Sequence, residues 1–217
     1  MEDRAEPVSS LEASLDEQSH GEAQRGEFIA WHYPVELEDD ITTRDGATLR
    51  LRPIRPDDAD ALVSFHSRLS WDSIYRRYFS MHPKLSSEEV AHLTQVDYVD
   101  RLAFVVQDGE HLVAVGRYDR YPSKDEAEVA FVVSDEYQHL GLGLSLLEHL
   151  AQAAWARGIT TFTAETLATN RDMMAVFHHS GFPVKSGFDD GEISVRFSIE
   201  PTAESFARRE EYRKGMV

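Results

Sequence analysis

Residues 126–167 constrain the fold more than any other part of the chain. A strand pattern over 126–133 is followed by a polar turn, the sequence Gln138-His139-Leu140-Gly141-Leu142-Gly143 and an apolar helical pattern from about Leu142 to Arg157. Gly158 is placed to end that helix, and the β-branched residues 160–167 predict another strand. A strand, a helix and a strand in this order favour a parallel strand pair.

The flanking segments predict strands joined by tight turns and a few short helices. Strand patterns over 102–107 and 112–121 precede the one at 126–133, with Asp108-Gly109 and a turn at Pro122 between them. Earlier segments predict a hairpin around Arg44-Asp45-Gly46 and helices over 56–69 and 73–79, and Ser86 with Glu89 predicts a capping box that opens a third helix. Later segments predict a helix over 171–180 and a strand over 192–199. We therefore expect a mixed α/β (α+β) domain over 40–200, with antiparallel strands in the meander.

Charge divides the chain of 217 residues into unequal parts. The sequence has 22 Lys and Arg residues and 39 Asp and Glu residues, which gives a net charge of −17. Residues 1–40 contain twelve of the acidic residues and only two arginines. Residues 1–26 have too few large apolar side chains to offset the cost of ordering the chain, and residues 1–35 are predicted to be a disordered acidic N-terminal tail. The apolar side chains between Phe28 and Val35 leave a strand or a packing arm as the alternative there. Residues 201–217 are predicted to be a charged C-terminal extension.

The composition argues against several functions. A net charge of −17 disfavours general binding to nucleic acid, whose phosphates need cationic partners. No apolar run is long enough to span a membrane, and the acidic start lacks a secretory signal pattern, so we expect a cytoplasmic protein. The absence of cysteine removes disulfides, thiolate nucleophiles and Cys-ligated zinc, and no HExxH spacing occurs, so no metal is expected.

The glycine-containing loop predicts an anion site. Gly141 and Gly143 at a helix start place unpaired backbone N–H groups at the positive end of the helix, which suits a pyrophosphate. A phosphate-loop NTPase would need a lysine here, and none is present. A dinucleotide-binding fingerprint would need a third glycine where Leu146 stands.

This loop is also the first of several motifs that resemble one family. Gln138-x-x-Gly141-x-Gly143, after an apolar strand and ahead of a helix, resembles the acyl-CoA pyrophosphate loop of the GNAT superfamily of N-acetyltransferases. The segment from Asn170 to Gly181-Phe182 resembles the fourth helix of that family. Four further segments resemble, more narrowly, bacterial Pat-like protein lysine acetyltransferases, which act on acyl-CoA synthetases. These segments are Arg52-Pro53-Ile54-Arg55-Pro56-Asp57-Asp58, Tyr75-Arg76-Arg77-Tyr78-Phe79, Asp97-Tyr98 and Ala127-Glu128-Val129-Ala130-Phe131-Val132-Val133.

The resemblance, which covers about residues 46–199, implies a fold and a cofactor. It implies the GNAT acyl-CoA N-acyltransferase fold, a central mixed and mostly antiparallel sheet flanked by helices, with acetyl-CoA as cosubstrate. It also implies cofactor contacts from residues of the strand end, the glycine loop and the next helix start: Phe131, Val132, Val133, Gln138, His139, Leu140, Gly141, Leu142, Gly143 and Asn170. For Asn170, capping of the following helix is an equal alternative.

Acetyl transfer from a thioester to an amine needs a base for the amine proton and stabilisation of the oxyanion. Period-two alternation places Glu126 and Glu128 on one strand face with apolar Ala130 and Val132, where a carboxylate among apolar neighbours would be a stronger base. The resemblance selects Glu128 as the general base, with Glu126 as the second choice. Phe177 stands where many family members have a tyrosine general acid, so that position gives the leaving thiolate no proton.

The favoured function is therefore an acetyl-CoA-dependent N-acetyltransferase acting on an amine, most of all a protein lysine. Because the chain has no cysteine, the acetyl group is expected to pass directly to the acceptor in a ternary complex. Two alternatives remain open at this point: an acetyltransferase for small-molecule amines, and a non-catalytic module that binds or senses acyl-CoA.

Overall fold

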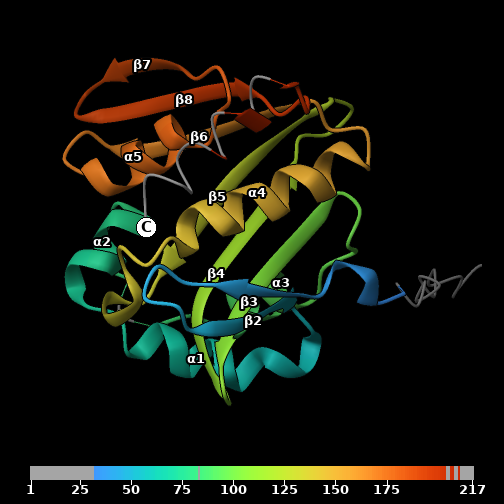
Figure 1. Ribbon diagram of the computed structural model, residues 1–217. Helices are drawn as coiled ribbons and strands as arrows, with labels where there is room; N and C mark the ends of the chain where they lie inside the picture. Colours follow the sequence, from blue (N-terminus) through green and yellow to red (C-terminus); the bar gives the residue numbers. More distant parts are fainter. Residues whose placement is uncertain (1–31, 83, 204–205, 208–209, 211–217) are drawn as a thin grey trace, which may run out of the picture. The chain divides into compact units, whose positions relative to one another are not determined.

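An eight-stranded mixed sheet organises the protein. The computed structural model of the chain describes residues 32–82, 84–203, 206–207 and 210. Its strands follow the order β1-β2-β3-β4-β5-β6-β8-β7, with helices against the sheet (Figure 1). Every neighbouring pair is antiparallel except β5 and β6. The predicted mixed, mostly antiparallel sheet flanked by helices is confirmed.

The first five strands form two antiparallel groups that join into one sheet. β1 (Asp39–Thr42) and β2 (Thr48–Pro53) make the predicted hairpin, and β3 (Arg101–Asp108), β4 (His111–Arg120) and β5 (Glu126–Val133) make the predicted meander. Alternation of buried side chains along β5 places Val129 and Phe131 in the core. The opposite strand face carries Glu126, Glu128, Ala130 and Val132, as the period predicts.

Three short helices lie between β2 and β3. A 3-10 turn, η2 (Pro56–Asp58), leads into α1 (Ala59–Ser67), so the first predicted helix begins as a tighter turn than expected. α2 (Trp71–Tyr78) follows, and then α3 (Ser87–Thr94). The predicted capping box opens α3: the Ser86 hydroxyl accepts the Glu89 N–H at 3.2 Å, and the Glu89 carboxylate accepts the Ser86 N–H at 2.7 Å.

The parallel pair is short, and this shortness creates an opening in the sheet. After β5 come the 3-10 turn η3 (Asp135–Tyr137), α4 (Leu142–Trp155) and β6 (Thr161–Leu167). The β5–β6 register begins at Glu126 with Thr161 and ends at Glu128 with Thr163. β5 nevertheless continues to Val133, where it still pairs with β4, and β6 continues to Leu167. The two strands therefore part beyond Glu128, and the peptide groups of β5 that face β6 lose their partner strand there.

The last elements are α5 (Arg171–His179), β7 (Lys185–Asp189) and β8 (Glu192–Ser198). β8 matches a predicted strand, whereas β7 was missed. All five residues of β7 are exposed because it is an edge strand, and its sequence includes Gly187. An exposed edge strand carries no alternation of apolar and polar side chains, which is the signal that a sequence pattern detects.

The ends of the chain are described only in part. Residues 1–31 of the predicted tail lie outside the described residues, as does most of the predicted C-terminal extension. At the near end of the tail, Val35–Leu37 forms the 3-10 turn η1, and the Tyr33 ring packs edge-on against Tyr98 at 5.9 Å. Among the described helices, none combines the length and the apolar character of a bilayer-spanning segment.

A buried ion pair ties β2 to the start of α1. Both Arg52 terminal nitrogens bond to the Asp58 carboxylate, at 2.7 and 2.6 Å, and both side chains are about one tenth exposed. Asp58 also accepts the Arg55 N–H at 2.7 Å. Burial raises the pKa of Asp58 but the hydrogen bonds from Arg52 and Arg55 outweigh it and hold the pKa below its usual range. The pair therefore orients α1 on the face of the sheet.

Removing this carboxylate should destabilise the protein strongly. We expect Asp58→Ala to lower the free energy of unfolding by about 3–5 kcal/mol, because it leaves a buried guanidinium without its anion. Urea unfolding followed by circular dichroism measures the change. Asp57→Ala, at the exposed neighbouring position, is the matched control and should change stability little. Equal effects of the two variants would contradict the role given to Asp58.

Candidate active site

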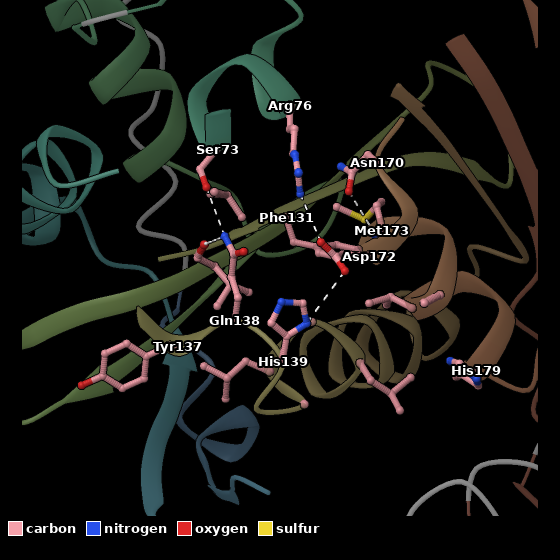
Figure 2. Close-up of a pocket in the computed structure, with 18 of the residues that line it drawn as sticks. Ser73, Arg76, Phe131, Tyr137, Gln138, His139, Asn170, Asp172, Met173 and His179 are labelled. Carbon is pink, nitrogen blue, oxygen red and sulfur yellow. Dashed lines mark hydrogen bonds and ion pairs between the residues drawn. The ribbon is translucent and has the colours of Figure 1, made fainter. Parts of the chain in front are cut away.

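Two hollows lie along β5, on either side of the point where it leaves β6. The first, called the cofactor pocket, has a volume of about 240 Å³ and lies among α2, the end of β5, the following loop, the start of α4 and α5 (Figure 2). The second, called the acceptor cleft, has a volume of about 390 Å³ and is lined by Glu128 together with residues of β6, β7 and β8. One strand therefore contributes to both hollows.

The cofactor pocket gathers most of the residues predicted to contact the cofactor. Its lining includes every residue of that set except Leu140: Phe131, Val132, Val133, Gln138, His139, Gly141, Leu142, Gly143 and Asn170. Leu140 instead turns its carbonyl to the Arg44 N–H at 3.1 Å. The strand end, the loop and the helix start thus converge on one space, as the order of elements predicts.

Glycine is required at the two positions of the loop for different structural reasons. Gly141 precedes α4 with φ of 91°, a left-handed conformation that favours glycine. Gly143 lies within the first turn of α4, where a Cβ atom would stand 3.2 Å from the Val176 side chain and 3.6 Å from the Phe131 ring. Gly143 therefore lets α4 approach α5 and β5 closely, a requirement for packing that the anion-binding interpretation did not include.

Asp135 holds α2 against the loop that follows β5. Its carboxylate accepts the Ser70 N–H at 2.9 Å, the Ser70 hydroxyl at 2.6 Å and the Ser73 hydroxyl at 2.8 Å. Burial alone would raise the pKa of Asp135, but these hydrogen bonds outweigh it and hold the pKa below its usual range. Gln138 joins the same group, because its amide donates to Ser73 at 3.1 Å and to the Val133 carbonyl at 3.3 Å. We call this set the Asp135 clamp.

A second set of charges joins three elements beside the pocket. Figure 2 shows Arg76 of α2 and His139 of the loop both directed at Asp172 of α5. The Arg76 Nη1 to Asp172 Oδ2 distance is 3.1 Å, and His139 Nδ1 lies 3.8 Å from Asp172 Oδ1. An arginine and a histidine therefore converge on one carboxylate, which marks a place suited to negative charge.

Two further predicted residues have roles in packing. The Asn170 side-chain oxygen accepts the Met173 N–H at 3.1 Å and so caps α5, the alternative that the sequence left open, while Asn170 also lines the cofactor pocket. Phe177 is 1% exposed and contacts Phe131 and Phe197 at ring distances of 6.0 and 5.7 Å. The position of the missing tyrosine is therefore part of the hydrophobic core.

Glu128 and Glu126 have different surroundings. Glu126 bonds to Arg196, with Nη2 to Oε1 at 2.7 Å, and this hydrogen bond holds the pKa of Glu126 below its usual range. Glu128 is exposed, and within the described ranges it has no hydrogen bond or ion pair. The expected apolar surroundings are wrong for Glu128, because Arg77 and Arg117 are close enough to interact with it and the cleft side is open. Its carboxylate therefore faces the cleft without a partner among the described residues.

Sequence patterns missed several residues of the two hollows. In the cleft, the Tyr121 hydroxyl lies 3.0 Å from the Thr163 hydroxyl, and Glu165 lines the same wall. In the pocket, Met173 and Val176 of α5 lie at helical spacing, which was the one sequence signal for them. In the described part of the chain, no group of three side chains could hold a metal ion.

The comparisons with known proteins agree with this architecture. Residues 69–182 match the Acetyltransferase (GNAT) family, so the chain belongs to that family and is an acyltransferase. Acetyltransferase Pat of Mycolicibacterium smegmatis is 31% identical over 144 residues, which cover 65% of this chain and 43% of that relative. Acetyltransferase PA5475 of Pseudomonas aeruginosa is 30% identical over 150 residues, covering 67% of this chain and 81% of that relative.

A solved structure is more similar still. The crystal structure of the GNAT domain of S. lividans PAT is 42% identical, with a TM-score of 0.73, and the match covers 77% of this chain and 99% of that domain. These similarities confirm the Pat-like GNAT resemblance read from the motifs. The chain spans less than half of the length of the M. smegmatis relative.

The Asp135 clamp should stabilise the protein in a pH-dependent way. Because the folded pKa of Asp135 is lowered, its contribution is present above the unfolded pKa of about 4 and is lost as pH falls through the folded value. We expect Asp135→Asn to lower the free energy of unfolding by about 1 kcal/mol at neutral pH. Urea unfolding between neutral and acidic pH measures it. Glu136→Gln is the control, and a difference that persists unchanged at low pH would contradict the assignment.

Proposed function

We propose that the chain is an acetyl-CoA-dependent N-acetyltransferase that passes the acetyl group directly to an amine, favouring a protein lysine, with Glu128 as general base. One observation carries the proposal: Glu128 and the stretch from Phe131 to Val133 lie on the same strand, at the point where β5 parts from β6. A thioester in the cofactor pocket and an amine in the acceptor cleft would meet there. Residues 40–200 would form the catalytic domain.

The cofactor site follows from the open edge of β5. Beyond Glu128 its peptide groups face no partner strand, so an extended amide chain such as the pantetheine arm has hydrogen-bond partners there. The pyrophosphate would lie at the N-terminus of α4, where unpaired N–H groups and the helix dipole favour an anion. Arg76 and His139 would then exchange the Asp172 carboxylate for phosphate oxygens. We therefore assign the residues that line the cofactor pocket to contacts with acetyl-CoA.

The reaction requires a neutral amine. A lysine ammonium has a pKa of about 10.4, so the base must remove a proton before or during attack. Glu128 takes that proton, the amine nitrogen bonds to the thioester carbon, and the C–S bond breaks with its electron pair on sulfur. The N–H of Val133, on the open edge of β5, would hold the thioester and polarise its carbonyl, whereas the N–H of Val132 points to β4. Since Phe177 is buried and apolar, the thiolate leaves without a proton from that residue.

The acceptor cleft offers one carboxylate without a partner to an amine. Its charged lining is mixed, with Glu128 and Glu165 beside Lys185 and Arg196. Arg196 is already bonded to Glu126, and Glu128 is the carboxylate that would receive an ammonium group. Residues of the edge strand β7 line the cleft, which would admit a lysine attached to a larger body. The names of the Pat relatives point to the same class of enzyme. A cytoplasmic location stays a prediction from the sequence.

The base assignment predicts a specific loss in one variant. Glu128→Gln should lower kcat/KM by about 10²–10⁴-fold while leaving the Kd for acetyl-CoA unchanged, because the amide keeps the size of the side chain but accepts no proton. Thiol release measures turnover, and isothermal titration measures binding. Glu126→Gln is the matched control and should lose far less, since Glu126 is already bonded to Arg196. Turnover of Glu128→Gln equal to that of the unmodified chain would refute the assignment.

The acceptor class is tested separately. We expect labelled acetyl-CoA and a bacterial lysate to give acetyl-lysine on specific proteins, with an acyl-CoA synthetase among the purified candidates to be assayed. A panel of small amines should release little thiol. Fast turnover of a small amine would favour the small-molecule alternative, and binding of acetyl-CoA with no turnover of any acceptor would favour a sensing module.

A further inference from the structure

A third, smaller cavity lies behind the cofactor pocket. It has a volume of about 30 Å³ and lies between the sheet and helices α1, α2 and α3. Its walls are mostly apolar, with Leu62 and Leu69 on one side and Val115 and Ala130 on the other. Arg77 and Arg117 are the two cations that line it. We call it the inner cavity.

The two arginines of the inner cavity are short of negative charge. Within the described residues, Arg77 has no ion pair or hydrogen bond with a carboxylate, and its guanidinium contacts the Tyr78 ring at 5.2 Å. Arg117 pairs with Asp119 through Nη1, but its Nε is buried without a partner. Burial lowers the pKa of both groups, that of Arg117 to about 10, with the charge of Arg77 contributing.

Such an arrangement is costly unless an anion completes it. Two partly buried like charges repel each other, and the buried Nε–H of Arg117, which has no acceptor, costs free energy. Glu128 attracts both arginines, but it forms no hydrogen bond with either and faces the acceptor cleft. Apart from Asp119 on Nη1 of Arg117, no described carboxylate bonds to these two guanidinium groups, so the inner cavity has donors and positive charge for a further acidic group.

The inner cavity connects with the cofactor pocket rather than with the acceptor cleft. Arg77 and Val132 line both the inner cavity and the cofactor pocket. The lining of the acceptor cleft shares no residue with the inner cavity. A carboxylate would therefore reach Arg77 on the acyl group of the thioester, and not on the acceptor protein.

We propose that the inner cavity binds the distal carboxylate of a dicarboxylic acyl group, so that the chain also transfers short acyl groups of the malonyl class. The cavity has room for about two water molecules, which the two carboxylate oxygens would replace. This inference rests on the proposed function. The bonds are those of acetyl transfer: the amine nitrogen bonds to the thioester carbon, the C–S electron pair goes to sulfur, Glu128 takes the proton, and the distal carboxylate is unchanged.

Charge, and not size alone, should decide which acyl groups fit. A branched alkyl chain of the same shape would cover the guanidinium N–H groups without giving them an acceptor. A carboxylate instead forms charge-assisted hydrogen bonds with them. The matched pair of probes is malonyl-CoA and 3-methylbutanoyl-CoA, because their acyl groups have the same number and arrangement of heavy atoms.

The experiment measures the Kd of both probes with the full chain and no acceptor. We expect malonyl-CoA to bind at least about tenfold more tightly than 3-methylbutanoyl-CoA, and we expect Arg77→Gln to abolish that ratio. Arg117→Gln should reduce the ratio as well, and thermal unfolding shows whether each variant is folded. Arg76→Gln, one residue away and bonded to Asp172, is the control and should keep the ratio. The ratio of the two Kd values is measured within each variant, so a general loss of affinity for the CoA part changes both values alike and leaves the ratio unchanged.

Each outcome decides the matter. Equal affinities in the unmodified chain, or a malonyl preference that survives in the folded Arg77→Gln variant, would overturn the proposal. Transfer is then tested with an acceptor that accepts acetyl groups, by the mass of the modified product, and failure to transfer malonyl would limit the cavity to binding and overturn the added activity. Failure of the proposed function is distinguishable, since it would abolish acetyl transfer but leave the binding ratio measurable.

Discussion

The early end of the β5–β6 pairing is the constraint on which the rest of the structure depends. Three residue pairs join the strands, and beyond Glu128 and Thr163 the two chains separate. A continuous sheet would leave no open peptide edge and no pocket between α2, α4 and α5. The separation places the end of β5 beside the glycine loop and leaves Glu128 at the junction. The backbone pairing of β5 with β6 therefore fixes where the candidate active site lies, and the side chains only line it.

The helix α2 depends on that opening and also bounds it. The Asp135 clamp anchors the start of α2 to the loop after β5, at Ser70 and Ser73. Two later residues of α2 line different hollows. Arg76 pairs with Asp172 beside the cofactor pocket, and Arg77 lines both that pocket and the inner cavity. Adjacent residues on one helix thus have separate electrostatic roles, which is why they serve as a matched pair of variants.

Local patterns predicted much of the fold, for identifiable reasons. The capping box at Ser86, the glycine after α4 and the alternation along β5 are rules about neighbours in sequence, and the structure contains all three. Edge strand β7 was missed because an exposed strand has no apolar period. Asp135 was missed because its partners Ser70 and Ser73 are more than sixty residues away along the chain.

The sequence by itself determined the order of elements, the strand face that carries Glu126 and Glu128, and the position of the glycine loop at a helix start, because each follows from short-range periodicity and turn chemistry. The tertiary structure decided which glutamate has a partner. Arg196 forms hydrogen bonds with Glu126, whereas Glu128 lines the cleft without one among the described residues. The tertiary structure alone also brought Arg77 and Arg117 to one cavity, since contact between a helix and a sheet depends on packing that no local pattern encodes.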